Sequence, residues 1–202
     1  MKYQFIDDEI PYTGKELSSH WAYRSFGMLG DSVIGFIGPC HVNLTDMVDL
    51  EDVLNNDYIY SKKMLHFIIE IFNISLQEGI LLQRLFSSVI QDRLCSLVLE
   101  SAGISDSAKN NAAIVKRYGD DLFVNNTAKL SVSICTQSPT SVLIHTGLNI
   151  DPEGTPVEAS GLSTELGLSG AAIKTMALAC MRALSEEWRD IGLACCKVRA
   201  VV

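Results

Sequence analysis

The stretch AKLSVSICTQSPTSVLIHTGLNID, residues 128–151, reads as a β-hairpin whose arms meet around Ser138-Pro139-Thr140. In both arms apolar residues alternate with polar or small ones, and successive side chains of a strand point to opposite faces. If the numbers of two facing residues add to an even value, the odd-numbered residues of both arms lie on the same face of the hairpin. A loop of three or five residues gives this register. The hairpin is therefore expected to have one apolar face and one polar face.

The polar face supplies the candidate ligand-binding residues. In the expected register Ser133 faces His145. An ammonium group, hydroxyls, an imidazole and an amide then lie on one face of the hairpin and could form the floor of a ligand pocket. A glycine in that floor would leave room for close approach. The alternative is a water-exposed side of the sheet, where such residues are common. The candidate residues are Lys129, Ser131, Ser133, His145, Gly147 and Asn149.

Outward from the hairpin, the pattern predicts alternating strands and helices. Two capping boxes, Thr13 with Glu16 and Ser75 with Glu78, predict a short helix and a long one. The order of elements favours an α+β fold, in which helices pack on a mixed, largely antiparallel sheet within a single domain over residues 1–202. The predicted elements are a helix over 13–27, strands over 32–38 and 64–72, an irregular acidic loop over 46–57 with one helical turn, a meander of short strands over 111–151, helices over 75–103, 157–166 and 171–191, and a last strand over 194–202.

The composition of the chain narrows the function classes. Hydrophobic residues make up 48% and charged residues 20%, which indicates a well-packed globule. A net charge of -8 without a basic cluster argues against nucleic-acid binding. No apolar run approaches the roughly 20 residues of a membrane span, and the N-terminus lacks the order of a signal peptide. We therefore expect a cytoplasmic protein, and the apolar character makes a homo-oligomer plausible.

Three further groups of polar residues are candidate sites. His20 and Arg24, one helical turn apart, could form the rim of an anion-binding pocket, or simply a helix edge with a snorkelling arginine. Cys40 and His41 precede an acidic run, but the spacing favours a solvated loop and no metal site. His66 is expected to be a satisfied interior histidine.

Several segments together resemble an archaeal family, domain of unknown function 366: SSHWAYRSFGMLGDSVIGFIGPC, MVDLED, MLHFIIE, KLSVSI and LIHTGLNID. The family is similar in fold to the biotin and lipoate protein ligases and the octanoyltransferases, relatives of class II aminoacyl-tRNA synthetases. The resemblance implies that Lys129 takes the role of the lysine that holds the acyl carbonyl or adenylate phosphate. It also implies that residues 145–149 form the facing strand.

The resemblance also has departures. The ligases carry an Arg-Arg-x-Ser-Gly-Gly-Gly loop where residues 46–63 are acidic and lack glycine, which argues against ATP as a cofactor. Ser160 stands where the octanoyltransferases have a nucleophilic cysteine, and helix capping is its expected role. The leading hypothesis is an acyl- or carboxylate-group transferase or ligase-like enzyme that acts on a small acid, or on its adenylate or thioester, with Lys129 as the anchor. This hypothesis allows an acceptor protein as a partner. The alternative is a noncatalytic binding or assembly protein that kept the fold.

Overall fold

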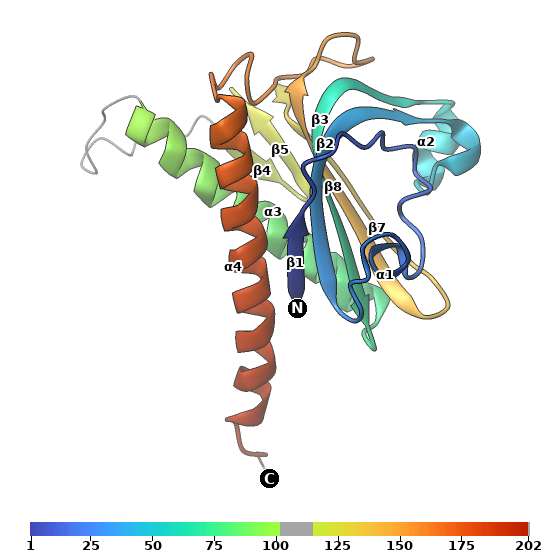
Figure 1. Ribbon diagram of the computed structural model, residues 1–202, viewed down its shortest axis with the longest axis vertical. Coiled ribbons are helices and arrows are strands. Elements are labelled where there is room, and N and C mark those ends of the chain that lie inside the picture. Colours follow the sequence, from blue (N-terminus) through green and yellow to red (C-terminus); the bar gives the residue numbers. More distant parts are fainter. Residues whose placement is uncertain (102–114, 202) are drawn as a thin grey trace.

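The computed structural model describes residues 1–101 and 115–201 and contains two sheets (Figure 1). The larger sheet has five strands in the order β1-β2-β3-β8-β7, and the smaller has the order β4-β5-β6. Strands β1 and β2 are parallel, and the other neighbours are antiparallel, as the sequence predicted. The strands are β1 (Lys2–Phe5), β2 (Ser32–Val42), β3 (Ile59–Phe72), β4 (Val115–Tyr118), β5 (Asp121–Val124), β6 (Ala128–Lys129), β7 (Ser131–Gln137) and β8 (Ser141–Asp151).

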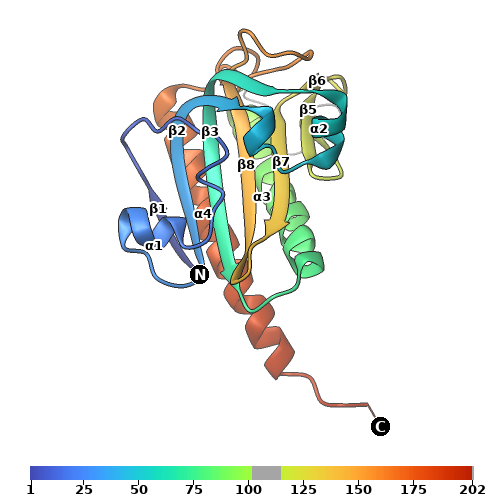
Figure 2. The ribbon, with the colours of Figure 1, turned by 90° about the vertical axis from the view of Figure 1, so that its right-hand side faces the viewer.

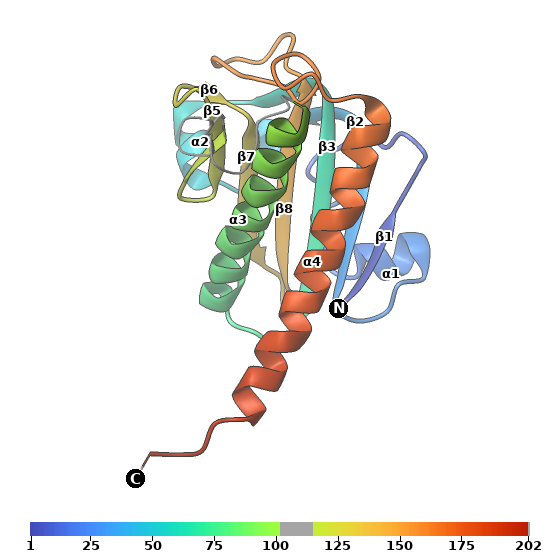
Figure 3. The same cartoon turned by 90° about the vertical axis from the view of Figure 1, so that its left-hand side faces the viewer.

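Two long helices, α3 (Leu76–Ser101) and α4 (Gly170–Cys196), cover one face of the larger sheet (Figure 3). The capping box predicted for α3 is present, because the Ser75 N–H donates to the Glu78 carboxylate at 2.6 Å. The odd-numbered residues of β3 face these helices and form the main core with them. Core side chains from these elements include Leu65, Phe67, Ile69, Ile71, Leu82, Phe86, Ile90, Met176, Cys180 and Leu184.

The opposite face of this sheet carries shorter elements (Figure 2). They are α1 (Trp21–Phe26), the 3-10 helix η1 (Leu44–Asp46) and α2 (Leu50–Asn55). A second core lies on this face and contains Ile34, Phe36, Met64 and Ile68. The even-numbered residues of β3 therefore face the elements that border the pocket described below.

The hairpin of β7 and β8 forms, but its register differs by one residue from the prediction. Ser133 pairs with Thr146, not with His145. The reason is the turn: Ser138 N–H donates to Ser141 O at 2.8 Å, so the loop contains only Pro139 and Thr140. An even loop length shifts every pair by one and places the odd-numbered residues of β7 on the opposite face from those of β8.

Three predicted elements also differ. The Thr13–Glu16 box forms at 2.8 Å, but the helix begins only at Trp21, because His20 adopts a left-handed conformation (φ 61°). Residues 157–166 contain turns and no helix, since the backbone around Ser160 bonds to Lys129. The C-terminal strand is absent from the described residues up to 201, because α4 continues to Cys196.

Within the described residues 1–101 and 115–201, no helix combines the length and apolarity needed to cross a bilayer.

Candidate functional site

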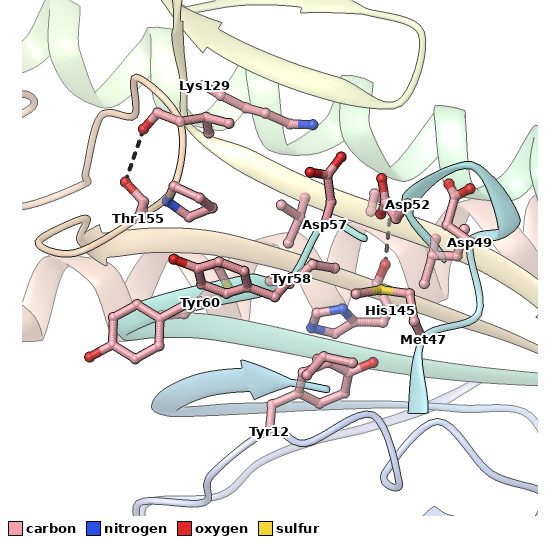
Figure 4. Close-up of a pocket in the computed structure, with 18 of the residues that line it drawn as sticks. Tyr12, Met47, Asp49, Asp52, Asp57, Tyr58, Tyr60, Lys129, His145 and Thr155 are labelled. Carbon is pink, nitrogen blue, oxygen red and sulfur yellow. Dashed lines mark hydrogen bonds between the residues drawn. The ribbon is translucent and has the colours of Figure 1, made fainter. Parts of the chain in front are cut away.

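A pocket of about 400 Å³ lies on the sheet face opposite the long helices (Figure 4). One wall is formed by residues 46–60, and the other by the β4–β5 turn, β6 and residues 155–159. A cavity of this volume accommodates a small organic molecule. The floor comes from β3, β7 and β8, through Met64, Val132, Ile134, His145 and Asn149.

Lys129 is fixed in this pocket by backbone pairing on two sides. It pairs with Phe123 of β5, and its N–H and C=O bond Glu158 and Ser160 at 3.0 Å each. Its ammonium lies 2.8 Å from the Asp121 carboxylate, and the two side chains are 34% and 25% exposed. Burial raises the pKa of Asp121, although the bond and charge of Lys129 oppose this rise. Because an ammonium has three donors, the pair with Asp121 leaves donor capacity for a ligand.

Asn149 contributes an unpaired acceptor to the floor. Its side-chain N–H donates to the Lys129 carbonyl at 3.4 Å, and only 4% of the residue is exposed. Since a carbonyl oxygen can only accept, this bond orients the amide and leaves Oδ1 as the free atom. Oδ1 has no hydrogen-bond partner among the described residues. A buried acceptor without a partner costs free energy, so a ligand donor at this position would be stabilising.

A chain of hydrogen bonds holds the His145 ring in place. His145 Nε2 lies 3.0 Å from His66 Nδ1, and His66 Nε2 lies 3.2 Å from the Gly38 carbonyl. Because the carbonyl requires a donor, His66 carries its proton on Nε2, and His145 then donates from its own Nε2. The Tyr12 ring stacks on His145 with centroids 3.8 Å apart. His145 is therefore oriented with Nδ1 as the acceptor of its ring.

Both imidazoles are kept neutral by burial. Burial lowers the pKa of His66 to about 3, although the bond to the Gly38 carbonyl opposes this. Burial also lowers the pKa of His145 well below its usual value, and repulsion from His66 adds to the effect. The prediction of a satisfied interior histidine at position 66 is confirmed.

Carboxylates dominate the charge around the pocket. Burial raises the pKa of Asp52, and the charges of Asp49 and Asp57 raise it further. No group of three or more His, Cys, Asp or Glu side chains within residues 1–101 and 115–201 is arranged to hold a metal ion. The acidic side chains that line the pocket are Asp46, Asp49, Asp52, Asp57, Asp120 and Asp121.

Of the residues predicted from the hairpin, Lys129, His145 and Asn149 meet at the pocket. Ser133 borders it, but its hydroxyl bonds Gln83 Nε2 and Thr146 Oγ1, each at 3.0 Å. The shifted register thus places two apolar residues of β7, Val132 and Ile134, beside the imidazole and the amide in the floor.

Other predicted residues have structural roles. Ser131 is fully buried and accepts the Leu122 N–H at 2.8 Å, outside the pocket lining. A Cβ at Gly147 would lie 2.3 Å from Met64 Sδ, so this glycine makes room for Met64. The Ser160 hydroxyl donates to the Ala128 carbonyl at 3.2 Å and caps no helix.

His20 and Arg24 do not line the pocket. The His20 N–H donates to Glu70 Oε1 at 2.7 Å, and Arg24 donates to Ser18 Oγ at 2.9 Å. The proposed rim is thus not formed by these two residues.

The sequence did not identify Tyr12 or the acidic run over residues 46–57 as parts of the pocket. Tyr12 reaches the pocket through an isolated parallel bridge to Cys40, a long-range contact that no local pattern indicates. The acidic run over residues 46–57 is expected from the sequence to be a solvated loop, whereas four of its aspartates line the pocket.

Comparison with known sequences identifies a family model and a relative that match this chain. The family model described as Domain of unknown function (DUF366) matches residues 1–199. Uncharacterized protein MJ0805 from Methanocaldococcus jannaschii is 33% identical over 155 residues, which are 74% of this chain. The match spans only 63% of the length of that relative.

Comparison with solved structures shows which proteins share this fold. A protein of unknown function from Pyrococcus horikoshi has a TM-score of 0.80 and 37% identity, over 99% of this chain and all of that one. The biotin protein ligase from Aquifex aeolicus in complex with biotin and ATP has a TM-score of 0.54 and 15% identity, over 90% and 68% of the chains. Protein Ta0514 from T. acidophilum with bound lipoic acid has a TM-score of 0.54 and 14% identity, over 94% and 86%. The fold is therefore that of the biotin and lipoate protein ligases.

Proposed function

The chain belongs to the family described as Domain of unknown function (DUF366), and we propose that its pocket binds a small carboxylic acid or acyl group as a transferase or ligase-like enzyme would. The observation that carries the proposal is the position of Lys129, whose ammonium borders a sheet-floored pocket with Val132 and Ile134 in its floor. An ammonium held beside a carboxyl or carbonyl oxygen stabilises negative charge that develops there, and this effect is large in a site from which water is excluded.

The remaining pocket residues would position the ligand. Val132 and Ile134 would contact its apolar part, and Lys129 would bind its carboxyl or carbonyl oxygen. The stacked, hydrogen-bonded His145 ring would give the floor a fixed shape. Transfer to an acceptor protein, assembly into a homo-oligomer and a cytoplasmic location stay predictions.

ATP, which is bound in the Aquifex aeolicus ligase structure, does not fit the residues of this pocket. Among the described residues of the lining, Lys129 is the one lysine or arginine, and it is already paired with Asp121 and stands among six aspartates. A triphosphate carries several negative charges and needs backbone N–H groups or cations around it. The proposed function therefore does not include ATP, and a thioester is the activated form that suits this pocket better.

The test is a thermal-shift titration with octanoic acid, lipoic acid and biotin. At about 100 times its Kd, a ligand adds roughly 2.7 kcal/mol and raises the Tm by about 5 to 10 °C for a chain of this size. We expect Lys129→Ala to abolish the shift. Lys62→Ala is the matched control, because Lys62 also forms an ion pair, with Asp151 at 3.3 Å, but does not line the pocket. An unchanged shift in Lys129→Ala would overturn the proposal.

A noncatalytic binding protein is the second candidate, and the poor fit to ATP favours it. The two candidates differ in turnover. Hydroxylamine reacts slowly with an octanoyl thioester on its own, releasing the thiol and forming a hydroxamate, so the rate without protein is the baseline. The protein should accelerate this reaction only if it transfers acyl groups, and the acceleration should then depend on Lys129. Ligand binding without acceleration would favour the binding protein.

A further inference from the structure

The charge of the pocket does not match a ligand that carries only a carboxylate. Six aspartates line the cavity, and Lys129 is paired with one of them, Asp121. Asp49, Asp52 and Asp57 have no ion pair with any side chain in the described ranges 1–101 and 115–201. A purely anionic ligand would be repelled by this wall, whereas a cation would be attracted.

The aspartates repel one another, so a cation bound between them would stabilise this side of the pocket. Asp49, Asp52 and Asp57 come from the start of α2 and the segment after it, and Figure 4 shows them along the same side of the pocket. Burial raises the pKa of Asp52, and the charges of Asp49 and Asp57 raise it further, while the charge of Lys129 opposes the rise. A positively charged group between these carboxylates would relieve the repulsion and gain charge-assisted hydrogen bonds.

Asn149 gives an independent indication of a donor. Asn149 lines the same pocket, and its Oδ1 is buried without a partner among the described residues. A carboxylate has only acceptor oxygens and cannot satisfy an amide oxygen. A ligand that carries an N–H group can bond Oδ1. The floor and the acidic wall therefore both favour a ligand with an N–H donor, such as a protonated amine.

The lining also suits an organic cation. Three tyrosines, Tyr12, Tyr58 and Tyr60, line the pocket (Figure 4). Aromatic faces attract ammonium groups, and the effect is larger when water is excluded. Apolar side chains of β7 lie in the floor beside them, and they would contact a hydrocarbon chain.

We propose that the ligand of this pocket is a zwitterion with separated charges, in which Lys129 binds the carboxyl group and the wall of Asp49, Asp52 and Asp57 binds a protonated amine. A short hydrocarbon chain between the two charges lies over Val132 and Ile134, and an N–H group bonds Asn149 Oδ1. The carboxyl half of this assignment rests on the proposed function above, whereas the amine half rests on the acidic wall and Asn149.

Isothermal titration calorimetry with matched probes tests the proposal. Hexanoate carries only the carboxylate, hexylamine only the amine, and 6-aminohexanoate both. 4-Aminobutanoate and 8-aminooctanoate, each with its acid-only and amine-only analogues, cover other separations of the charges. We expect an amino acid of suitable length to bind at least tenfold tighter than either analogue of the same length. Equal binding of the amine-free acid, or no binding by any amino acid of the series, would overturn the inference.

Two variants locate the amine site. Asp52→Asn removes one charge of the wall and should reduce the advantage of the amino acid over the amine-free acid about tenfold. Glu51→Gln is the matched control, because Glu51 is the neighbouring residue of α2, is exposed and does not line the pocket. Equal effects of the two substitutions would contradict the assignment.

The same experiment separates this inference from the proposed function. If the acid and the amino acid bind equally and both need Lys129, the proposed function stands and the zwitterion is refuted. If the amine alone binds as tightly as the amino acid and Lys129→Ala changes nothing, the acidic wall binds amines but the proposed carboxyl site is refuted.

Discussion

Acidification from pH 7 to pH 5 should destabilise the protein through its buried histidine pair. The pKa of His66 is lowered to about 3 in the folded protein, while an unfolded histidine has a pKa near 6.5. The unfolded state therefore binds more protons between these two values, and stability is present above pH 6.5 and is lost as the pH falls. At pH 5, about 1.5 units below the unfolded pKa, the loss from His66 alone is about 2 kcal/mol, or roughly 4 to 8 °C in Tm.

The assay is urea denaturation followed by circular dichroism at several pH values between 7 and 5. His66→Gln removes one of the two titrating rings, so its free energy of unfolding should fall less steeply with acid than that of the wild type. His41→Gln, at an exposed position, should leave the wild-type slope unchanged. If His66→Gln loses as much stability as the wild type over this range, then His66 is not the buried neutral group described here.

Three further substitutions test local features. Gly38→Ala would place a Cβ 1.9 Å from the Ile10 carbonyl oxygen, so we expect a loss of about 3 kcal/mol or more in urea denaturation. Ser75→Ala removes the side chain that accepts the Glu78 N–H at 3.3 Å and should cost about 1 kcal/mol in the same assay. Asp52→Asn should raise the Tm at pH 7 by an amount that corresponds to about 0.2 to 1 kcal/mol. Because the pKa of Asp52 is raised in the folded protein, this gain should disappear below the usual pKa of an aspartate.

Each of these variants has a control and a contrary outcome. Gly170→Ala, where an added Cβ meets nothing within 4 Å, should be tolerated; a loss equal to that of Gly38→Ala would contradict the steric argument. Ser96→Ala removes a hydroxyl whose one bond to the described part of the chain is to the Asp92 carbonyl within α3, and it should cost less than loss of the cap. A lower Tm for Asp52→Asn at pH 7 would contradict the repulsion within the acidic wall.

Local sequence patterns predicted the elements that local forces determine. The apolar run over residues 64–72 and the capping box before α3 correspond to β3 and α3 as observed. Of the helix predicted over 13–27 only Trp21–Phe26 forms, because the His20 N–H donates to the distant Glu70 carboxylate and not to a helical carbonyl. The predicted helix around Ser160 failed for a similar reason, since the backbone there pairs with Lys129. Long-range backbone partners of this kind leave no periodic signal.

The candidate site was predicted in part for the same reason. The residue types of Lys129, His145 and Asn149 were informative, and the structure places all three at one pocket. The register was wrong because a two-residue and a three-residue loop around Pro139 are hard to distinguish from sequence. The stacking of Tyr12 on His145 depends on a bridge between residues far apart in the chain, and only the structure reveals it.

Backbone and side-chain amide NMR spectra, recorded while an acid that produces a thermal shift is added, test the binding site most directly. We predict that the largest chemical-shift changes will occur at Lys129, His145 and the side-chain amide of Asn149, and that Lys129→Ala will abolish them. Changes centred on α3 and α4, or changes that persist in Lys129→Ala, would contradict the assignment of this pocket as the ligand site.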